Sequence, residues 1–177
     1  GNLWIGTMGG GLNLFDRRTG KFTRFTIFNS NISTNYVQHI TESKDGYLWL
    51  SNSVCFEKFD KKTKTFQHYV YDPNDSTTIS SSKVLCTFED SKGNLWFGTG
   101  NGLNLLDQAT NKFKVYRTND GLPNNFINSI IEDNDQNLWI ATNKGISKFI
   151  NAVNLPEKPQ FKNYTYEDGL QGNGFNR

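Results

Sequence analysis

The sequence predicts an all-β fold built from repeated four-stranded units, and three observations support this prediction. All four tryptophans, Trp4, Trp49, Trp96 and Trp139, occupy one position of a repeat, at spacings of 45, 47 and 43 residues. Each lies in a short β-rich run bounded by glycine, asparagine or aspartate, which is typical of strands joined by tight turns. Turn formers are abundant, with 23 asparagines and 16 glycines, whereas alanine, the best helix former, occurs three times.

The repeat also explains the glycine-rich start of the chain. The stretch GNLWIGTMGGGLNLFD (1–16) recurs as GNLWFGTGNGLNLLD (93–107), with weaker copies at 45–60 and 136–150. A phosphate-binding loop would be followed by Lys-Ser/Thr or by a helix that supplies free N–H groups. Another strand follows instead, so the glycines are expected to form a turn between two strands.

The third repeat shows the strand pattern most clearly, with strands expected at 84–90, 94–99, 102–107 and 112–118. The second strand of each repeat is apolar on both faces, which indicates a sheet that is covered on both sides. Four-stranded units of this length, stacked face to face, make a β-propeller in which each unit is one blade. The tryptophan is then expected to pack between blades rather than to bind a ligand.

We expect residues 1–177 to form a single β-propeller segment of about four four-stranded antiparallel blades, cropped from a larger propeller. The first repeat begins in the turn before the tryptophan strand, so blade 1 is expected to lack its first strand. The expected blades span about 1–28, 35–71, 82–118 and 125–166, with 167–177 starting the next blade.

Composition excludes several classes of function. The net charge of +2, without a lysine or arginine stripe, does not fit nucleic-acid binding. No apolar run is long enough to span a membrane, and no export signal is visible. Cys55 and Cys86 fall at unrelated repeat positions; we expect small buried residues, with a reactive thiol or a disulfide as alternatives.

Ligand binding is expected on the face that carries the variable connections between repeats. These inter-repeat loops, which link the fourth strand of one repeat to the first strand of the next, span 26–35, 70–82, 118–125 and 165–174. Variable loops on a rigid scaffold are the usual binding elements. Tyr36, Asn124, Asn125 and Phe126 are the candidate ligand-binding residues, because an aromatic ring beside amides suits a polyhydroxylated ligand. The alternative is that Tyr36 and Phe126 belong to the blade core.

Enzyme and metal sites are not expected. SKDGYLW (43–49) nearly matches the Asp-box of sialidases, but the three converging arginines of such a glycosidase are missing. DNDQN (133–137) resembles the start of a calcium loop, yet it lacks the glycine and the distal glutamate and is better explained as a hairpin turn. His39 and His68 have no nucleophilic partner at a position that breaks the repeat. We therefore expect no catalytic residue, no metal ligand and no cofactor.

The core motif [DN]-x-x-G-N-L-W-[IF]-G-T-x-x-G-L-x-x-[FL]-D, together with DGLPNNFINSIIED (120–133), resembles the two-component regulator propeller repeat. The resemblance is strong in the first and third repeats. The second has Ser51-Asn52 in place of Gly-Thr and Cys55 in place of a glycine, and the fourth has Ala141 in place of a glycine.

The resemblance implies a seven-bladed propeller in the periplasmic sensor region of a hybrid two-component system (histidine kinase/response regulator) of Bacteroidetes. It implies that this region senses oligosaccharides, acts with a second protomer as a homodimer, and reaches the membrane only through other parts of the protein. The first hypothesis is therefore a non-enzymatic module that takes part in carbohydrate sensing. The alternatives are a protein-binding scaffold propeller and, less favoured, a propeller glycosidase or lyase.

Overall fold

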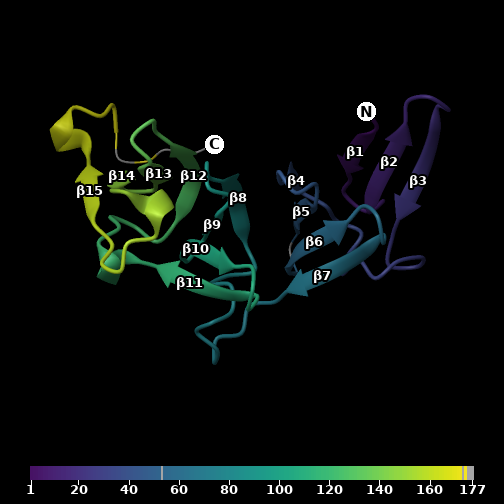
Figure 1. Cartoon of the computed structure of the whole chain (residues 1–177), viewed down its shortest axis with the longest axis horizontal. Helices are drawn as coiled ribbons and strands as arrows, with labels where there is room; N and C mark the ends of the chain where they lie inside the picture. Colours follow the sequence, from purple (N-terminus) through teal and green to yellow (C-terminus); the bar gives the residue numbers. More distant parts are fainter. Residues whose placement is uncertain (53, 173, 175–177) are drawn as a thin grey trace. The chain divides into compact units, whose positions relative to one another are not determined.

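The computed structural model describes residues 1–52, 54–172 and 174, and the regular structure of this part of the chain consists mainly of strands in antiparallel sheets (Figure 1). The expected start of a further blade, within 167–177, includes residues 173 and 175–177, which lie outside the described residues.

Each sheet is a meander in which strands that follow one another in sequence are neighbours. The first sheet contains β1 (Leu3–Gly6), β2 (Leu12–Asp16) and β3 (Lys21–Phe25). The second contains β4 (His39–Glu42), β5 (Leu48–Ser51), β6 (Phe56–Asp60) and β7 (Thr65–Tyr69). The third contains β8 (Val84–Glu89), β9 (Leu95–Thr99), β10 (Gly102–Asp107) and β11 (Lys112–Tyr116). The fourth contains β12 (Ile127–Glu132), β13 (Leu138–Thr142), β14 (Gly145–Phe149) and β15 (Phe161–Tyr164).

Single turns of 3-10 helix are the other regular elements of the described residues. They are η1 (Thr118–Asp120), η2 (Ala152–Asn154) and η3 (Tyr166–Asp168). No helix in this part of the chain has both the length and the apolar character that crossing a bilayer requires.

The chain folds as two compact units, Gly1–Val70 and Tyr71–Arg177. The first unit contains the first two sheets and the second unit contains the other two. The all-β prediction is confirmed, and the four strands of the third repeat lie close to their predicted bounds.

Two of the repeated tryptophans, Trp4 and Trp96, pack between neighbouring sheets as the sequence predicts, whereas Trp49 and Trp139 contact rings of their own sheets. In the first unit, the Trp4 ring lies 5.3 Å from the Phe59 ring of the second sheet. In the second unit, the fully buried Trp96 lies 6.0 Å from Phe149 of the fourth sheet, with the two rings edge to face. Edge-to-face aromatic pairs of this kind add to the stabilisation that area burial gives. One tryptophan thus joins the two sheets within each unit.

A carboxylate in the turn before the tryptophan strand fixes the indole in the second unit. Asp90 accepts a 2.9 Å hydrogen bond from Trp96 Nε1, and Asp133 accepts one of 2.8 Å from Trp139 Nε1. Desolvation acts to raise the pKa of Asp133, but hydrogen bonds from Asn137, Trp139 and Lys148 outweigh it and hold this pKa well below the ordinary value. DNDQN (133–137) is accordingly the β12–β13 hairpin turn, and its first carboxylate is used within the turn.

A glycine is required where the chain leaves the turn between the second and third strands of a repeat, because the backbone of the neighbouring strand comes close at this point. A Cβ atom on Gly11 would lie 2.1 Å from the Phe25 carbonyl oxygen, and one on Gly145 would lie 2.1 Å from that of Tyr164. Both glycines also have left-handed φ angles, of 72° and 97°. The glycine-rich opening is therefore a strand connection in which the neighbouring strand leaves no room for a side chain.

We expect Gly11→Ala to lower the free energy of unfolding by about 2–3 kcal/mol, because it adds a backbone clash to an unfavourable φ. Gly20→Ala is the matched control: Gly20 has a similar φ of 67°, but a Cβ there would meet no atom within 4 Å. The control should lose only about 1–2 kcal/mol. Urea unfolding followed by tryptophan fluorescence measures both, and equal losses would rule out the close approach as the reason for Gly11.

The two cysteines have different surroundings. Cys55 is buried, whereas Cys86 is half-buried beside Gly98, and the two form no disulfide in the described structure. Desolvation raises the pKa of Cys55, a hydrogen bond with Ser33 lowers it, and the neighbouring Glu57 raises it further. A buried thiol with a raised pKa is a poor nucleophile, so Cys55 is a structural residue.

Candidate ligand-binding loop face

Tyr36 lies where the first inter-repeat loop enters the second sheet, against the turn between β1 and β2. We call a turn between the second and third strands of a repeat a central turn. Val37 N donates to Thr7 O (3.0 Å), Gly11 N donates to Asn35 O (2.8 Å), and Met8 and Tyr36 form an antiparallel bridge. Directly opposed residues of such a bridge project to the same side. Met8 and Tyr36 are therefore neighbours, with 74% and 49% of their surfaces exposed.

Phe126 occupies the matching place in the second unit. Gly102 N of the β9–β10 central turn donates to Asn125 O (2.7 Å), as Gly11 N does to Asn35 O. The Phe126 ring is half-buried, lies close to Gly100, and has the Lys83 ammonium 5.4 Å from its centroid. Phe126 is thus accessible on the loop face, and it has a cation beside it.

The two predicted asparagines support the loop with their side-chain oxygens. Asn125 Oδ1 accepts from Thr118 N (2.9 Å), and Asn124 Oδ1 accepts from Phe126 N (2.9 Å). Asn35 does the same in the first unit, where its Oδ1 accepts from Ile27 N (3.0 Å). Each of these oxygens already accepts one backbone N–H group, so the Nδ2 groups of Asn124 and Asn125 are the groups best placed to be offered to a ligand, as hydrogen-bond donors.

The four predicted site residues fall into two groups. Tyr36 belongs to the first unit, and Asn124, Asn125 and Phe126 belong together in the second. The core alternative for the rings does not hold for Tyr36, which is about half exposed, and Phe126 is not among the buried core residues of its unit. Exposure makes the rings available for a ligand, and binding by them stays a prediction.

Sequence reasoning missed the residues that anchor the inter-repeat loops. Each third strand carries a buried polar residue at the same repeat position, Asn13, Glu57, Asn104 or Ser147, and two of these, Glu57 and Asn104, bond to the loop before their sheet. Asn104 is fully buried, and its Oδ1 accepts from Ser80 N of the loop before its sheet (2.8 Å) while its Nδ2 donates to Ser80 Oγ (2.9 Å). The signal was present in the sequence as a polar residue recurring at one strand position.

Glu57 anchors the loop that leads to Tyr36. Its buried carboxylate accepts from Ser33 N (2.8 Å) and from Asn52 Nδ2 (2.8 Å), and it lies 3.0 Å from His68 Nε2. Desolvation raises the pKa of Glu57, although the bond from Ser33 N and the charge of His68 act to lower it. The imidazole also contacts the Asn31 carbonyl oxygen at 2.8 Å, so it bridges the loop to β7.

This carboxylate and imidazole do not form a catalytic pair with Cys55. The thiol is buried and its raised pKa disfavours the thiolate, which is the nucleophilic form. The residues that depart from the repeat in the second sheet compensate each other instead. Asn52 replaces the repeat threonine, donates to Glu57 and accepts from Cys55 N (2.8 Å). The cluster is a structural support for the loop face.

The fold and its loop face define a class: the chain is a segment of a β-propeller, built from four-stranded antiparallel blades. Residues 78–101 and 121–144 match the two component regulator propeller family. The resemblance inferred from the motifs is therefore confirmed, and it is this pair of segments that matches the family.

Solved structures agree with this assignment. The extracellular domain of a hybrid two component system from B. thetaiotaomicron is 26% identical with a TM-score of 0.79, over 99% of this chain and 23% of that chain. A second extracellular domain of such a system from the same organism is 27% identical with a TM-score of 0.74, over 97% of this chain and 24% of that one. The chain thus spans about a quarter of the length of these relatives.

A more distant structure shares the fold alone. Virginiamycin B lyase from Staphylococcus aureus, in a catalytically inactive H270A form with quinupristin, is 14% identical with a TM-score of 0.63, over 93% of this chain and 52% of that chain. A comparison with curated protein sequences gave no significant match.

Proposed function

We propose that the chain is part of the periplasmic sensor region of a hybrid two-component signalling protein and takes part in oligosaccharide recognition through its loop face. The role in sensing is supported by the propeller repeats and by the extracellular domains of hybrid two component systems that the chain resembles. In this proposal the segment has no catalysis of its own. It transmits the signal of ligand binding to a histidine kinase elsewhere in the protein. The protein acts as a homodimer.

The observation that carries the ligand class is the exposed Tyr36 ring on a rigidly anchored loop. A sugar presents an apolar C–H face that packs on an aromatic ring, and its hydroxyl groups accept hydrogen bonds from amide nitrogens. Tyr36 and Phe126 supply such rings, and the Nδ2 groups of Asn124 and Asn125 supply such donors. Buried Glu57 holds the loop before Tyr36, so little conformational entropy is lost when a ligand binds.

A thermal-shift screen of glycan oligosaccharides against the complete sensor region tests this proposal. For the oligosaccharide that gives a shift, Tyr36→Ala and Phe126→Ala are each expected to weaken binding about two- to ten-fold, the effect of one lost ring contact. Phe22→Ala is the control, because Phe22 is 59% exposed but lies on the outer strand β3. Isothermal titration calorimetry provides the affinities, and unchanged binding by both variants would remove these rings from the site.

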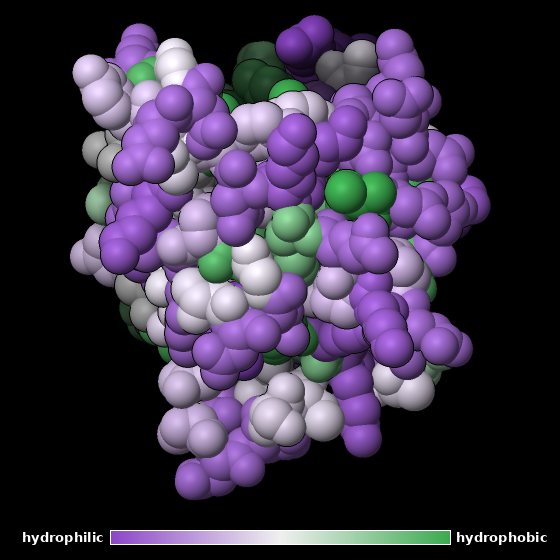
Figure 2. Space-filling model, turned by 90° about the vertical axis from the view of Figure 1, so that its left-hand side faces the viewer, coloured by the Kyte–Doolittle hydropathy of each residue, from purple (hydrophilic) through white to green (hydrophobic). Residues whose placement is uncertain are grey.

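A protein ligand is the second candidate, and one observation favours it. The loop before Tyr36 exposes Ile27 and Phe28, the latter to 86%, close in sequence to the Met8–Tyr36 pair. Exposed apolar residues that gather on loops are typical of protein contacts. Figure 2 shows the side on which the fourth sheet lies in Figure 1, and that side is mainly hydrophilic with scattered hydrophobic residues. Phe28→Asp distinguishes the two: it should leave oligosaccharide affinity unchanged and abolish a protein contact.

A further inference from the structure

The fourth sheet contains a long connection that the other sheets lack. The turns between the last two strands are short in the first three sheets, for example 17–20 between β2 and β3. Between β14 and β15 the chain instead makes an eleven-residue connection, 150–160, which includes η2. We call this segment the Leu155 loop, and it lies on the side of the sheets opposite to the inter-repeat loops.

The Leu155 loop is fixed to the third and fourth sheets. Asn94 Nδ2 donates to Val153 O (3.0 Å), and Asn151 N donates to Asn137 Oδ1 (2.8 Å). The side chains of Ala152 and Val153 are buried. A loop held by its own buried residues and by bonds to two sheets has a defined conformation.

This fixed conformation presents Leu155 in an unfavourable state. Leu155 has a left-handed φ of 51°, which a branched side chain rarely adopts, and it is 42% exposed. Strained backbone that the surrounding structure maintains is frequently associated with a functional site. The strained backbone at Leu155 therefore points to a ligand site beside this residue.

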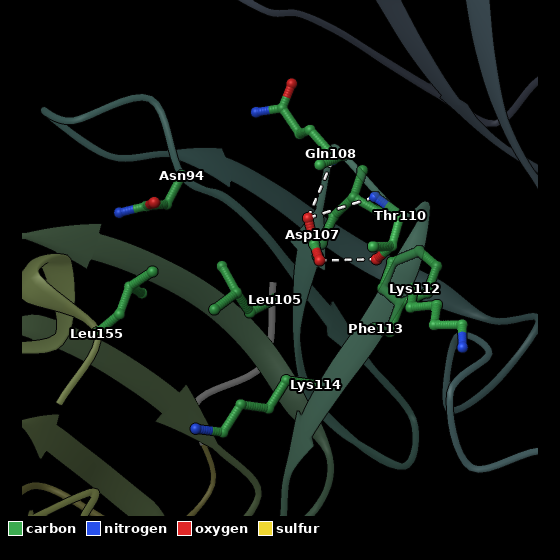
Figure 3. A pocket seen from close by; sticks show the side chains of 11 residues that line it. Asn94, Leu105, Asp107, Gln108, Thr110, Lys112, Phe113, Lys114 and Leu155 are labelled. Atoms are coloured by element: carbon green, nitrogen blue, oxygen red, sulfur yellow. Dashed lines mark hydrogen bonds between the residues drawn. The ribbon is translucent and has the colours of Figure 1, made fainter. Parts of the chain in front are cut away.

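Leu155 faces a groove in the second unit, formed with the β10–β11 hairpin (Figure 3). The groove has a volume of about 690 Å³, within the range of small-ligand sites. The register pairs Leu105 with Lys114 and Asp107 with Lys112, so these four side chains share the face of the hairpin that lines the groove. Figure 3 shows Leu105 and Leu155 on either side of the groove; Leu155 is the exposed one, and Leu105 is a core residue with 9% of its surface exposed.

The groove lining carries a net positive charge, because it includes two lysines, Lys112 and Lys114, and one aspartate, Asp107. Asp107 Oδ1 accepts from Ala109 N (2.9 Å) and its Oδ2 accepts from Thr110 Oγ1 (2.7 Å), so its oxygens are used within its own turn. Lys114 extends toward the side of Leu155, whereas Lys112 points away from it (Figure 3). Lys114 is exposed, and its ammonium lies 5.1 Å from the Tyr116 ring, where it remains available to an anion.

We propose that this groove binds a small amphipathic anion, with its apolar body between Leu105 and Leu155 and its carboxylate at Lys114. The site is separate from the loop face and does not depend on the proposed sensing function. The sequence offers a matched control, since Lys162 of β15 occupies the place of Lys114 in the next blade. Lys162 has the same 5.1 Å approach to a tyrosine ring, that of Tyr164, but it does not line the groove.

The test uses 4-phenylbutyrate and its uncharged analogue 4-phenyl-1-butanol, with binding measured by NMR on ¹³C-methyl-labelled leucines of the chain. We expect the methyl signals of Leu105 and Leu155 to shift, and the acid to bind about two- to five-fold more tightly than the alcohol, the effect of one exposed ion pair. Leu155→Ala should weaken both compounds about ten-fold through lost apolar contact.

The variants separate charge recognition from adventitious apolar binding. Lys114→Gln should make the acid and the alcohol bind equally, whereas Lys162→Gln should preserve their difference. Unchanged Trp96 indole signals verify that each variant is folded. The proposal is overturned if the original chain binds both compounds equally, if Lys114→Gln keeps the preference for the acid, or if only leucines away from the groove shift.

Discussion

Trp96→Ala is expected to lower the free energy of unfolding of the second unit by about 3–5 kcal/mol. The indole is fully buried and packs on Tyr116 of its own sheet and Phe149 of the next. Its removal deletes the contact that joins two sheets and leaves a cavity that the rigid strands cannot close. It also leaves Asp90 without the donor at Nε1.

Urea unfolding followed by far-ultraviolet circular dichroism measures this effect without relying on tryptophan fluorescence. Trp96→Phe separates packing from hydrogen bonding, because it keeps an aromatic ring but cannot donate to Asp90. It should lose less than the alanine variant. Phe22→Ala, at a largely exposed ring of the first unit that pairs with Phe15 across the strands, should lower stability by about 1 kcal/mol or less. A loss of that small size for Trp96→Ala would contradict the packing role of the tryptophan.

The contribution of the repeated motif explains why so much of the fold could be predicted from one sequence. Three features recur in the repeats: the tryptophan, the glycine after the central turn, and the turn aspartates. They recur because each blade packs against its neighbours in the same way. Trp96 fills the space beside Phe149, and Gly11 has no side chain that would clash with the Phe25 carbonyl oxygen. Such constraints come from neighbours at a fixed repeat distance, so they are visible as periodicity.

Less of the candidate site could be predicted from the sequence, because its residues lie in loops that do not follow the repeat. The loop positions of Tyr36 and Phe126 could be inferred, but the use of the Asn124 and Asn125 oxygens within the loop could not. The sequence does not show whether an asparagine side chain binds a ligand or a backbone N–H group. The pairing of Ser33 with Glu57 joins residues 24 positions apart, and only coordinates reveal it.

The Leu155 loop illustrates the same limit. Its length could be read from the sequence as an unusually long gap between β14 and β15. The bond from Asn94 to Val153 O, which aims the loop at the third sheet, depends on a neighbouring blade. Irregular segments are therefore where function can differ between blades that share one scaffold.

Glu57→Ala is expected to lower the free energy of unfolding of the first unit by about 2–4 kcal/mol, because it removes the acceptor of Ser33 N and one of the two acceptors of Asn52 Nδ2 at a buried position. Ser147→Ala, at the same repeat position, should lose only about 1 kcal/mol, because Ser147 makes a single hydrogen bond, to Asn163. Urea unfolding gives both values. Hydrogen exchange at Ser33 should accelerate in Glu57→Ala, and unchanged protection there would show that Glu57 does not anchor the loop.

The pH dependence of the same site has a definite sign. The folded-state pKa of Glu57 is raised by desolvation, so its carboxyl contributes most to stability below its unfolded pKa of about 4.3, and that contribution is lost as pH rises through the folded value. Glu57→Gln cannot ionise and should flatten this part of the stability profile above about pH 4. Its amide can still accept from Ser33 N but cannot also accept from Asn52 Nδ2, so a smaller, pH-independent loss should remain. If the stability of Glu57→Gln depended on pH as steeply as that of the original chain, another group would be the one that titrates. Glu57 would then act only as a hydrogen-bond acceptor.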